Sequence, residues 1–276
     1  MLISQIIELH RQRQDVLRAE TKLTLQIKAI MRRLCTKNHA EALKSGEINH
    51  DKFLKNIKAD ADDLYDAIVD EQENHPLYVV ATMSTAIFFQ ARELLQNSRK
   101  FLEKGIALIA AQLTISKWID GVPGMGIGSL AAIVGEAGDL SNYSSHSKLW
   151  KRLGLAPIKD KAPSEWRKKG GLSAEEWSAA GYSPIRRSQI WNIGQCVLKA
   201  QSERVNKETG EIIKPAGTYR CVYDQRKQYE LDRGIPKGHA HNRAIRYMEK
   251  RLIRDLWRAW RDQLVEAEFP QARKAA

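Results

Sequence analysis

The residues of this chain best suited to chemistry form a turn rich in glycine and proline, in the segment GVPGMGIGSLAAIVGEAGDL, Gly121–Leu140. Gly124 and Gly126 can take positive φ angles without a Cβ clash, and Pro123 fixes the φ angle at the entry to the turn. A helix that begins after such a turn presents backbone N–H groups without intrahelical partners. The turn, with Gly128, therefore predicts an anion-binding site. The alternative is a tight turn that only packs two helices together.

The basic residues predict which anion this would be. The chain has a net charge of +12 and a pI near 9.6, and residues 182–261 hold 18 Lys and Arg against 8 Asp and Glu. Such an excess favours a polyanion, above all nucleic acid. Trp150 and Trp191 lie among the cations, and we interpret them as core anchors rather than base-stacking groups. The candidate phosphate contacts are Lys148, Lys151, Arg152, Arg167, Lys168, Arg186, Arg187, Arg243 and Arg246.

A serine in a cationic loop is the candidate for covalent chemistry. The hydroxyl of Ser164 could attack a phosphodiester while Arg167 and Lys168 stabilise the developing charge. Because no base is assigned to this serine, Ser164 is by its sequence context alone an ordinary loop or N-cap residue.

Acidic and sulfur side chains give no strong metal signal. Glu136 and Asp139 lie three residues apart and could share one side of a helix, as ligands of a divalent cation do. We favour the alternative, in which Gly138-Asp139 ends one helix and Ser141 or Asn142 caps the next. The three cysteines are scattered without zinc-site spacing. We therefore predict no metal site.

Apolar periodicity predicts a mainly α protein. In residues 2–34, Leu9, Val16, Leu23 and Ile30 follow a heptad spacing typical of a coiled coil, or of one helix in an intramolecular bundle. Further helices are expected over 50–73, 77–112, 146–153, 173–180, 184–201 and 240–264, with an irregular stretch and a small β-ribbon over 203–236. We expect a coiled-coil or bundle region at 1–112, which dimerises, and a DNA-binding domain at 113–276.

Two patterns within the second region favour nucleic-acid binding. The Pro-Gly-x-Gly turn followed by Ser129, Ala131 and Ala132 is typical of a helix-hairpin-helix, whose amides hold a phosphate without reading bases. In the last helix, an apolar side opposes a basic side. The apolar side is predicted to consist of Ile245, Met248, Leu252, Leu256 and Trp260. Without an apolar run of membrane-spanning length or a leader, we expect a cytoplasmic, nucleoid-associated protein.

The order of motifs over Trp118–Pro157 resembles the C-terminal transposase domain of the insertion-sequence 110/116/902 family. The matching elements are Pro123-Gly124-Met125-Gly126, Ala131-Ala132, Gly135-Glu136-Ala137-Gly138-Asp139, Lys148-Leu149 and Gly154-Leu155-Ala156-Pro157. The likeness extends more loosely over 186–201 and the helix after His239, and the N-terminal helices resemble the coiled coil that precedes this domain in the family.

The resemblance implies a transposase that acts in DNA recombination as an oligomer, on DNA and with a possible guide or structured RNA. Ser164 lies at about the distance from the turn at which the family has its serine nucleophile, although the usual Ser-Gly context is absent. Ser188 is a second candidate for this serine. Family members also carry a RuvC-like domain with four acidic metal ligands, and residues 1–110 show no strand series with spaced acids. The resemblance thus implies Mg²⁺ only with an acidic partner. A non-catalytic architectural or regulatory protein derived from a transposase is the alternative.

Overall fold

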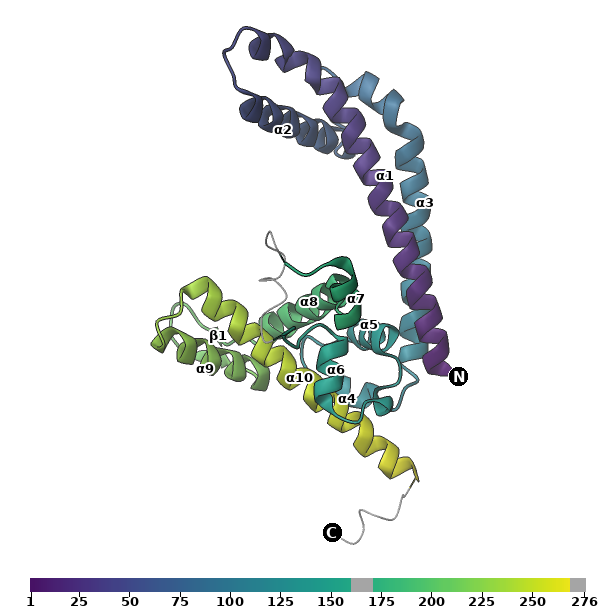
Figure 1. Cartoon of the computed structure of the whole chain (residues 1–276), viewed down its shortest axis with the longest axis vertical. Coiled ribbons are helices and arrows are strands. Elements are labelled where there is room, and N and C mark those ends of the chain that lie inside the picture. The colour runs from purple at the N-terminus through teal and green to yellow at the C-terminus, as the bar shows by residue number, and fades with distance from the viewer. Residues whose placement is uncertain (160–170, 269–276) are drawn as a thin grey trace. The chain divides into compact units, whose positions relative to one another are not determined.

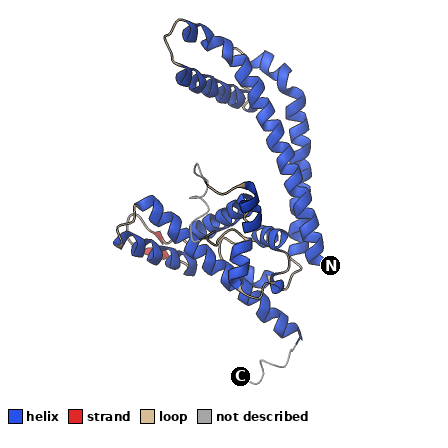
Figure 2. Cartoon of the chain, viewed as in Figure 1, coloured by secondary structure: helices blue, strands red, loops and turns tan. Residues whose placement is uncertain are grey.

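The structure, a computed structural model, describes residues 1–159 and 171–268, and it is mainly helical, as predicted (Figures 1 and 2). Two short strands, Arg204–Val205 (β1) and Ile212–Lys214 (β2), pair antiparallel. The helices are α1 Leu2–Lys44, α2 His50–Val69, α3 Tyr78–Ala110, α4 Ser116–Asp120, α5 Ile127–Ala137, α6 His146–Arg152, α7 Ala174–Ala180, α8 Pro184–Ala200, α9 Thr218–Asp232 and α10 Lys237–Glu268, with a 3-10 turn η1 at Leu140–Asn142.

The chain divides into two compact units at places other than the expected boundary at residue 112. The smaller unit comprises residues 11–103, and the larger unit comprises residues 1–10 and 104–276. The first turns of α1 and the last turn of α3 therefore pack with the larger unit. Each unit has its own cluster of buried apolar side chains.

The smaller unit is built from most of α1, from α2 and from α3 up to Glu103. Asn49 begins α2 as an N-cap, its side-chain oxygen accepting a hydrogen bond from the Lys52 N–H at 2.8 Å. The four residues of α1 that follow the heptad spacing, Leu9, Val16, Leu23 and Ile30, are half-buried, whereas Ile27 is fully buried with residues of α2 and α3. The core of the unit consists of Ile27, Met31, Cys35, Ala61, Leu64 and Ala81.

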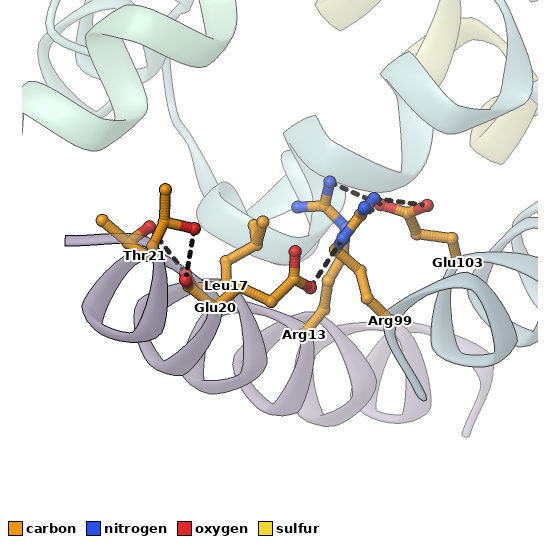
Figure 3. Close-up of polar contacts among 7 residues, drawn as sticks. Arg13, Leu17, Glu20, Thr21, Arg99 and Glu103 are labelled. Carbon is orange, nitrogen blue, oxygen red and sulfur yellow. Dashed lines mark hydrogen bonds and ion pairs between the residues drawn. The ribbon is translucent and has the colours of Figure 1, made fainter. Parts of the chain in front are cut away.

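Ion pairs join α1 to α3 in the smaller unit (Figure 3). Arg99 Nε donates to Glu20 Oε1 at 2.9 Å, and Arg13 Nε donates to Glu103 Oε1 at 2.8 Å. Arg99 also lies 3.2 Å from Glu103 Oε1, so the four side chains form one network. These side chains are 12–35% exposed, and their network favours one register of α1 against α3.

The larger unit packs around α10, whose predicted apolar face is confirmed. Ile245, Met248, Leu252, Leu256 and Trp260 are all buried in one core, together with residues of α5, α6 and α8. The tryptophan side chains tie α10 to this core: Trp260 Nε1 donates to Asp139 Oδ1 and Trp257 Nε1 donates to the Tyr143 carbonyl, both at 3.1 Å. The interpretation of Trp150 as an anchor agrees with its bond from Nε1 to the Lys250 carbonyl at 3.0 Å.

The prediction of irregular structure over 203–236 is wrong for the second half of this range, which forms α9. The ribbon ends at Lys214, and α9 then packs along α10. The groups that α9 buries are polar or amphipathic, namely Tyr219, Tyr223 and Glu230. Tyr219 Oη donates to Asp255 Oδ2 at 3.3 Å, and Glu230 Oε2 accepts from Arg243 at 3.0 Å. Because α9 has no apolar stripe, the pattern of apolar residues does not predict a helix there.

No helix in the described ranges is both long enough and apolar enough to span a membrane.

Candidate nucleic-acid interface

The glycine-rich turn connects α4 to α5 and is anchored on α8. Val122 and Met125 are buried, whereas Pro123, Gly126 and Gly128 are exposed. Gly124 has a φ angle of +87°, and a Cβ built there would lie 2.5 Å from the Cys196 carbonyl oxygen and 2.7 Å from Val197 Cα. Two features thus require glycine at this position: its positive φ angle and the close approach of α8.

The amide groups of residues 126–128 donate no backbone hydrogen bond within the described part of the chain. Gly126 is the N-cap of α5, and its carbonyl accepts from Ser129 and Leu130 at 2.9 and 3.2 Å. No side chain caps the helix. The N–H groups of residues 126–128 precede the first intrahelical bonds, and a Cβ at Gly126 or Gly128 would meet nothing within 4 Å. Three amides without intrahelical partners at a helix start are groups that an oxyanion can bind.

Gln201, which the sequence did not single out, links the turn to a second helix start. Its side chain is buried, Nε2 donates to the Pro123 carbonyl at 3.2 Å, and Oε1 accepts from the Tyr219 N–H at 2.9 Å. Its backbone carbonyl accepts from Gly217, the N-cap of α9, at 2.9 Å. Glycine is also needed at position 217, because a Cβ there would lie only 2.6 Å from Gln201 Oε1. Two glycine-capped helix starts, those of α5 and α9, are therefore held by one amide side chain.

Two cations that we did not predict contact the segment at Ala200–Ser202, next to which Gly124 packs. Lys214 Nζ donates to the carbonyl of Ala200 at 2.7 Å, and Ala200 is a residue against which Gly124 packs. Arg220, in the first turn of α9, donates to Ser202 Oγ at 2.8 Å. We define the turn site as the amides of residues 126–128 with Lys214 and Arg220. Both cations come from the region after residue 203, whose fold the sequence did not reveal.

Arg152 and Arg186 lie at the other end of α5. Arg186 Nε donates to Glu136 Oε2 and Arg152 Nε donates to the Glu136 carbonyl, both at 3.0 Å, and His10 Nε2 lies 3.1 Å from Glu136 Oε1. Burial opposes ionisation of Glu136, but the hydrogen bonds from His10 and Arg186 outweigh it and hold its pKa below the usual value. An 11-residue helix is about 16 Å long, so these arginines are separated from the turn amides by most of α5.

Arg187 is committed to an internal ion pair with α10. Its Nη1 donates to Glu249 Oε1 at 3.1 Å, its Nη2 lies 3.0 Å from Oε2, and its guanidinium lies over the Trp191 ring. Glu249 is fully buried, and Gly194 on α8 makes room for it, since a Cβ there would lie 2.9 Å from Glu249 Cγ. Burial raises the pKa of Glu249 to about 7 although Arg187 opposes the shift. Arg187 thus holds α8 against α10.

The remaining predicted contacts are spread over the larger unit. Lys148 and Lys151 are exposed on α6, and Arg246 is partly buried on α10. Arg243 pairs with the buried Glu230, which Arg226 also contacts. Arg167 and Lys168 lie outside the described residues. The predicted cations therefore do not form one patch with the turn amides in the part of the chain that the structure describes.

Of the two candidate nucleophiles, Ser164 lies outside the described residues. Ser188 is exposed, and its Oγ donates to the Ile185 carbonyl one turn earlier in α8 at 3.1 Å. It borders an open hollow of about 470 Å³ with Tyr182 and Trp191. A nucleophilic serine needs a base within hydrogen-bond reach, and the bond to Ile185 does not supply one.

The two acidic residues considered as metal ligands have other partners. Glu136 is paired with His10 and Arg186, while Asp139 Oδ1 accepts from the Ser141 N–H at 2.9 Å and from Ser141 Oγ at 2.8 Å. Asp139 is the N-cap of η1, so the acid itself provides the cap that we assigned to Ser141 or Asn142. Among residues 1–159 and 171–268 no group of three or more His, Cys, Asp or Glu side chains could hold a metal ion.

Comparisons of this chain with models of protein families, with curated proteins and with solved structures gave no match.

Proposed function

We propose that this protein binds the sugar-phosphate backbone of DNA through the turn site and acts in DNA recombination or transposition. The observation that carries the proposal is the row of open amides at residues 126–128, in front of a helix without a side-chain cap, in a chain of net charge +12. Lys214 and Arg220 add positive charge near the same turn. Contacts of this kind fix a protein on a duplex without reading its sequence.

We also propose which nucleic acids the protein binds, its oligomeric state and its location in the cell. A guide or structured RNA presents the same phosphates as DNA, so the amides alone do not distinguish the two. We propose that the N-terminal helices make the protein a homo-oligomer and that it associates with the nucleoid in the cytoplasm. Mg²⁺ would enter only with an acidic partner chain, because Glu136 and Asp139 already have hydrogen-bond partners within the chain.

The first prediction uses Gly128, where a side chain has room. Gly128→Glu should weaken binding to a 30-bp duplex at least 10-fold, because a carboxylate at the helix start occupies the amides and repels phosphate. The fold should remain, since a negative charge in the first turn stabilises a helix. Fluorescence anisotropy across a salt series gives the affinity and the number of phosphates neutralised.

The matched control for this test is Gly128→Ala, which adds a Cβ without charge and should bind within about twofold of the unchanged protein, as expected for open space at this position. Unchanged binding by the Gly128→Glu variant, with a thermal melt that shows it folded, would contradict the assignment of the turn site. Single-stranded DNA and a structured RNA measured in the same series rank the nucleic acids.

A covalent protein-DNA adduct would show whether Ser164 or Ser188 is the nucleophile. In a transposase of the proposed type, Ser164 Oγ forms a bond to phosphorus, the P–O bond to the leaving deoxyribose breaks, and the leaving oxygen takes up a proton. A nicked suicide substrate should then trap a protein-DNA adduct on a denaturing gel. Ser164→Ala should abolish the adduct, while Ser188→Ala should retain it.

The second candidate function is a non-catalytic architectural or regulatory role on DNA or structured RNA. It is favoured by the bonding of Ser188 to its own helix and by the pairing of Glu136 with His10 and Arg186. In this case duplex binding would depend on Gly128, and no adduct would form with any variant.

A further inference from the structure

One side of α3 in the smaller unit is a continuous apolar stripe that faces water. Met83, Ile87, Leu94 and Phe101 are each between 70% and 79% exposed, and Val80 is 44% exposed. Large apolar side chains on a surface are ordinary when they are scattered, but a contiguous row of them marks an interaction surface. We call these five residues the α3 stripe.

The spacing of the α3 stripe is that of a helix-helix seam. Val80, Ile87, Leu94 and Phe101 are seven residues apart, the repeat that keeps side chains aligned along a partner helix. Small residues alternate with them: Ser84, Ala91 and Ser98 each precede a large residue by three positions and lie on the same side of α3. Small residues between large ones let two helices approach closely.

The opposite side of α3 is already occupied, by both ion pairs and apolar side chains. Arg99 and Glu103 form the ion-pair network with Glu20 and Arg13 of α1 (Figure 3). Ala81 and Thr85 are fully buried on the inner side of the helix. The inner side of α3 thus carries the ion pairs and also packs Phe88 and Phe89 against the core of the smaller unit, while the five apolar residues of the stripe stay outside. A second helix is needed to cover the stripe.

We infer that the α3 stripe binds the α3 stripe of a second copy of this chain, with the two helices antiparallel. A two-fold axis between Ala91 and Leu94 places Leu94 opposite Ala91 of the partner subunit. The same axis places Ile87 opposite Ser98 of the partner subunit and Phe101 opposite Ser84 of the partner subunit. Each large side chain then meets a small one, so the stripe is complementary to itself, as an isologous interface requires.

Charge and area both agree with a second copy as the occupant. The polar residues beside the stripe are the uncharged Gln90 and Asn97 and the exposed Glu93 and Lys100, whose charges are opposite, so two copies can meet here without net repulsion. For the same reason the stripe does not suit a polyanion. With roughly 180 Å² for a fully exposed large side chain, the exposed fractions correspond to about 600 Å² per copy, and about 1,200 Å² for two copies is the lower limit of specific interfaces.

The test measures the mass of the full chain without nucleic acid, so its outcome is independent of the proposed DNA binding. Sedimentation equilibrium should show a dimer at micromolar concentrations. Ile87→Glu combined with Leu94→Glu should raise the dimer dissociation constant at least 100-fold, because two carboxylates would be buried in each stripe. Leu54→Glu, at an exposed position on α2, should leave the dimer unchanged. A monomer at all concentrations, or a dimer indifferent to the double variant, would overturn the inference.

Cysteine cross-linking tests the direction of the helices, in a chain whose exposed Cys196 and Cys221 are replaced by serine. Under mild oxidation, a mixture of the Ser84→Cys and Phe101→Cys chains should form a disulfide-linked heterodimer. Either chain alone should not cross-link, since identical positions lie about 25 Å apart in the antiparallel pair. Rapid cross-linking of Phe101→Cys by itself would show parallel helices and contradict the proposed pairing.

Discussion

Replacing Gly124 by alanine should lower the free energy of unfolding by about 3 kcal/mol. About 1–2 kcal/mol comes from forcing a residue with a Cβ into the left-handed region. The remainder comes from overpacking, which costs about 1–3 kcal/mol in a close-packed interior. The added Cβ at this position meets backbone atoms of α8, at 2.5 Å and 2.7 Å, rather than a side chain that could move. Urea unfolding followed by circular dichroism measures the change.

Gly210 provides the matched control for this substitution. Its φ angle of +73° is close to that of Gly124, but nothing lies within 4 Å of its Cβ position. Gly210→Ala should therefore cost only the backbone contribution, about 1 kcal/mol. Equal losses for the two variants would show that the turn does not press against α8. Because Gly124→Ala unfolds the anchor itself, it is unsuitable for testing nucleic-acid binding, for which Gly128 is the better position.

The second large effect is a pH dependence that arises from Glu249. Its pKa is raised by burial from 4.5 to about 7 in the folded chain. The folded state therefore holds this proton more tightly than the unfolded state does. The resulting stability is fully present below pH 4.5 and is lost as the pH rises toward and through about 7. A shift of this size corresponds to ~3 kcal/mol.

Glu249→Gln should remove this pH dependence, because glutamine cannot ionise. The difference in unfolding free energy between the variant and the unchanged protein should move by ~3 kcal/mol in favour of the variant between about pH 5 and about pH 8. Urea unfolding at several pH values measures it. Glu230→Gln is the control: burial opposes ionisation of Glu230, but hydrogen bonds from Arg243 and Arg226 lower its pKa, so its contribution is lost only at acid pH. A Glu249→Gln curve parallel to the unchanged protein would contradict the assignment.

Local patterns in the sequence predicted the elements whose apolar residues repeat with the helical period. The face of α10 from Ile245 to Trp260 is buried as expected, because its burial follows directly from that period. In α3, by contrast, the sequence holds two apolar lines. Periodicity shows that both exist, but it cannot show that Ile106 is buried while Leu94 and Phe101 are exposed.

The elements that escaped prediction depend on polar or distant contacts. The helix α9 buries Tyr219, Tyr223 and Glu230, so its pattern has no apolar stripe to recognise. In the candidate site, the turn itself could be predicted from Pro123 and its glycines. Its anchoring could not, since Gln201 reaches the Pro123 carbonyl across 78 positions of the chain. For the same reason Lys214 and Arg220 were missed, while Arg187 carries a role in packing that its charge alone does not reveal.

The two sides of α3 should respond in opposite ways to ammonium sulfate. The ion pairs that join α3 to α1 lie near the surface, so dissolved ions screen them. The attraction between the two helices therefore weakens as ionic strength rises. Sulfate is excluded from apolar surface, and it therefore strengthens any association that hides the α3 stripe. Concentrated salt would thus loosen the packing inside each chain while it promotes precipitation or pairing between chains, and crystals grown from such solutions should bury this stripe in preference to other surfaces.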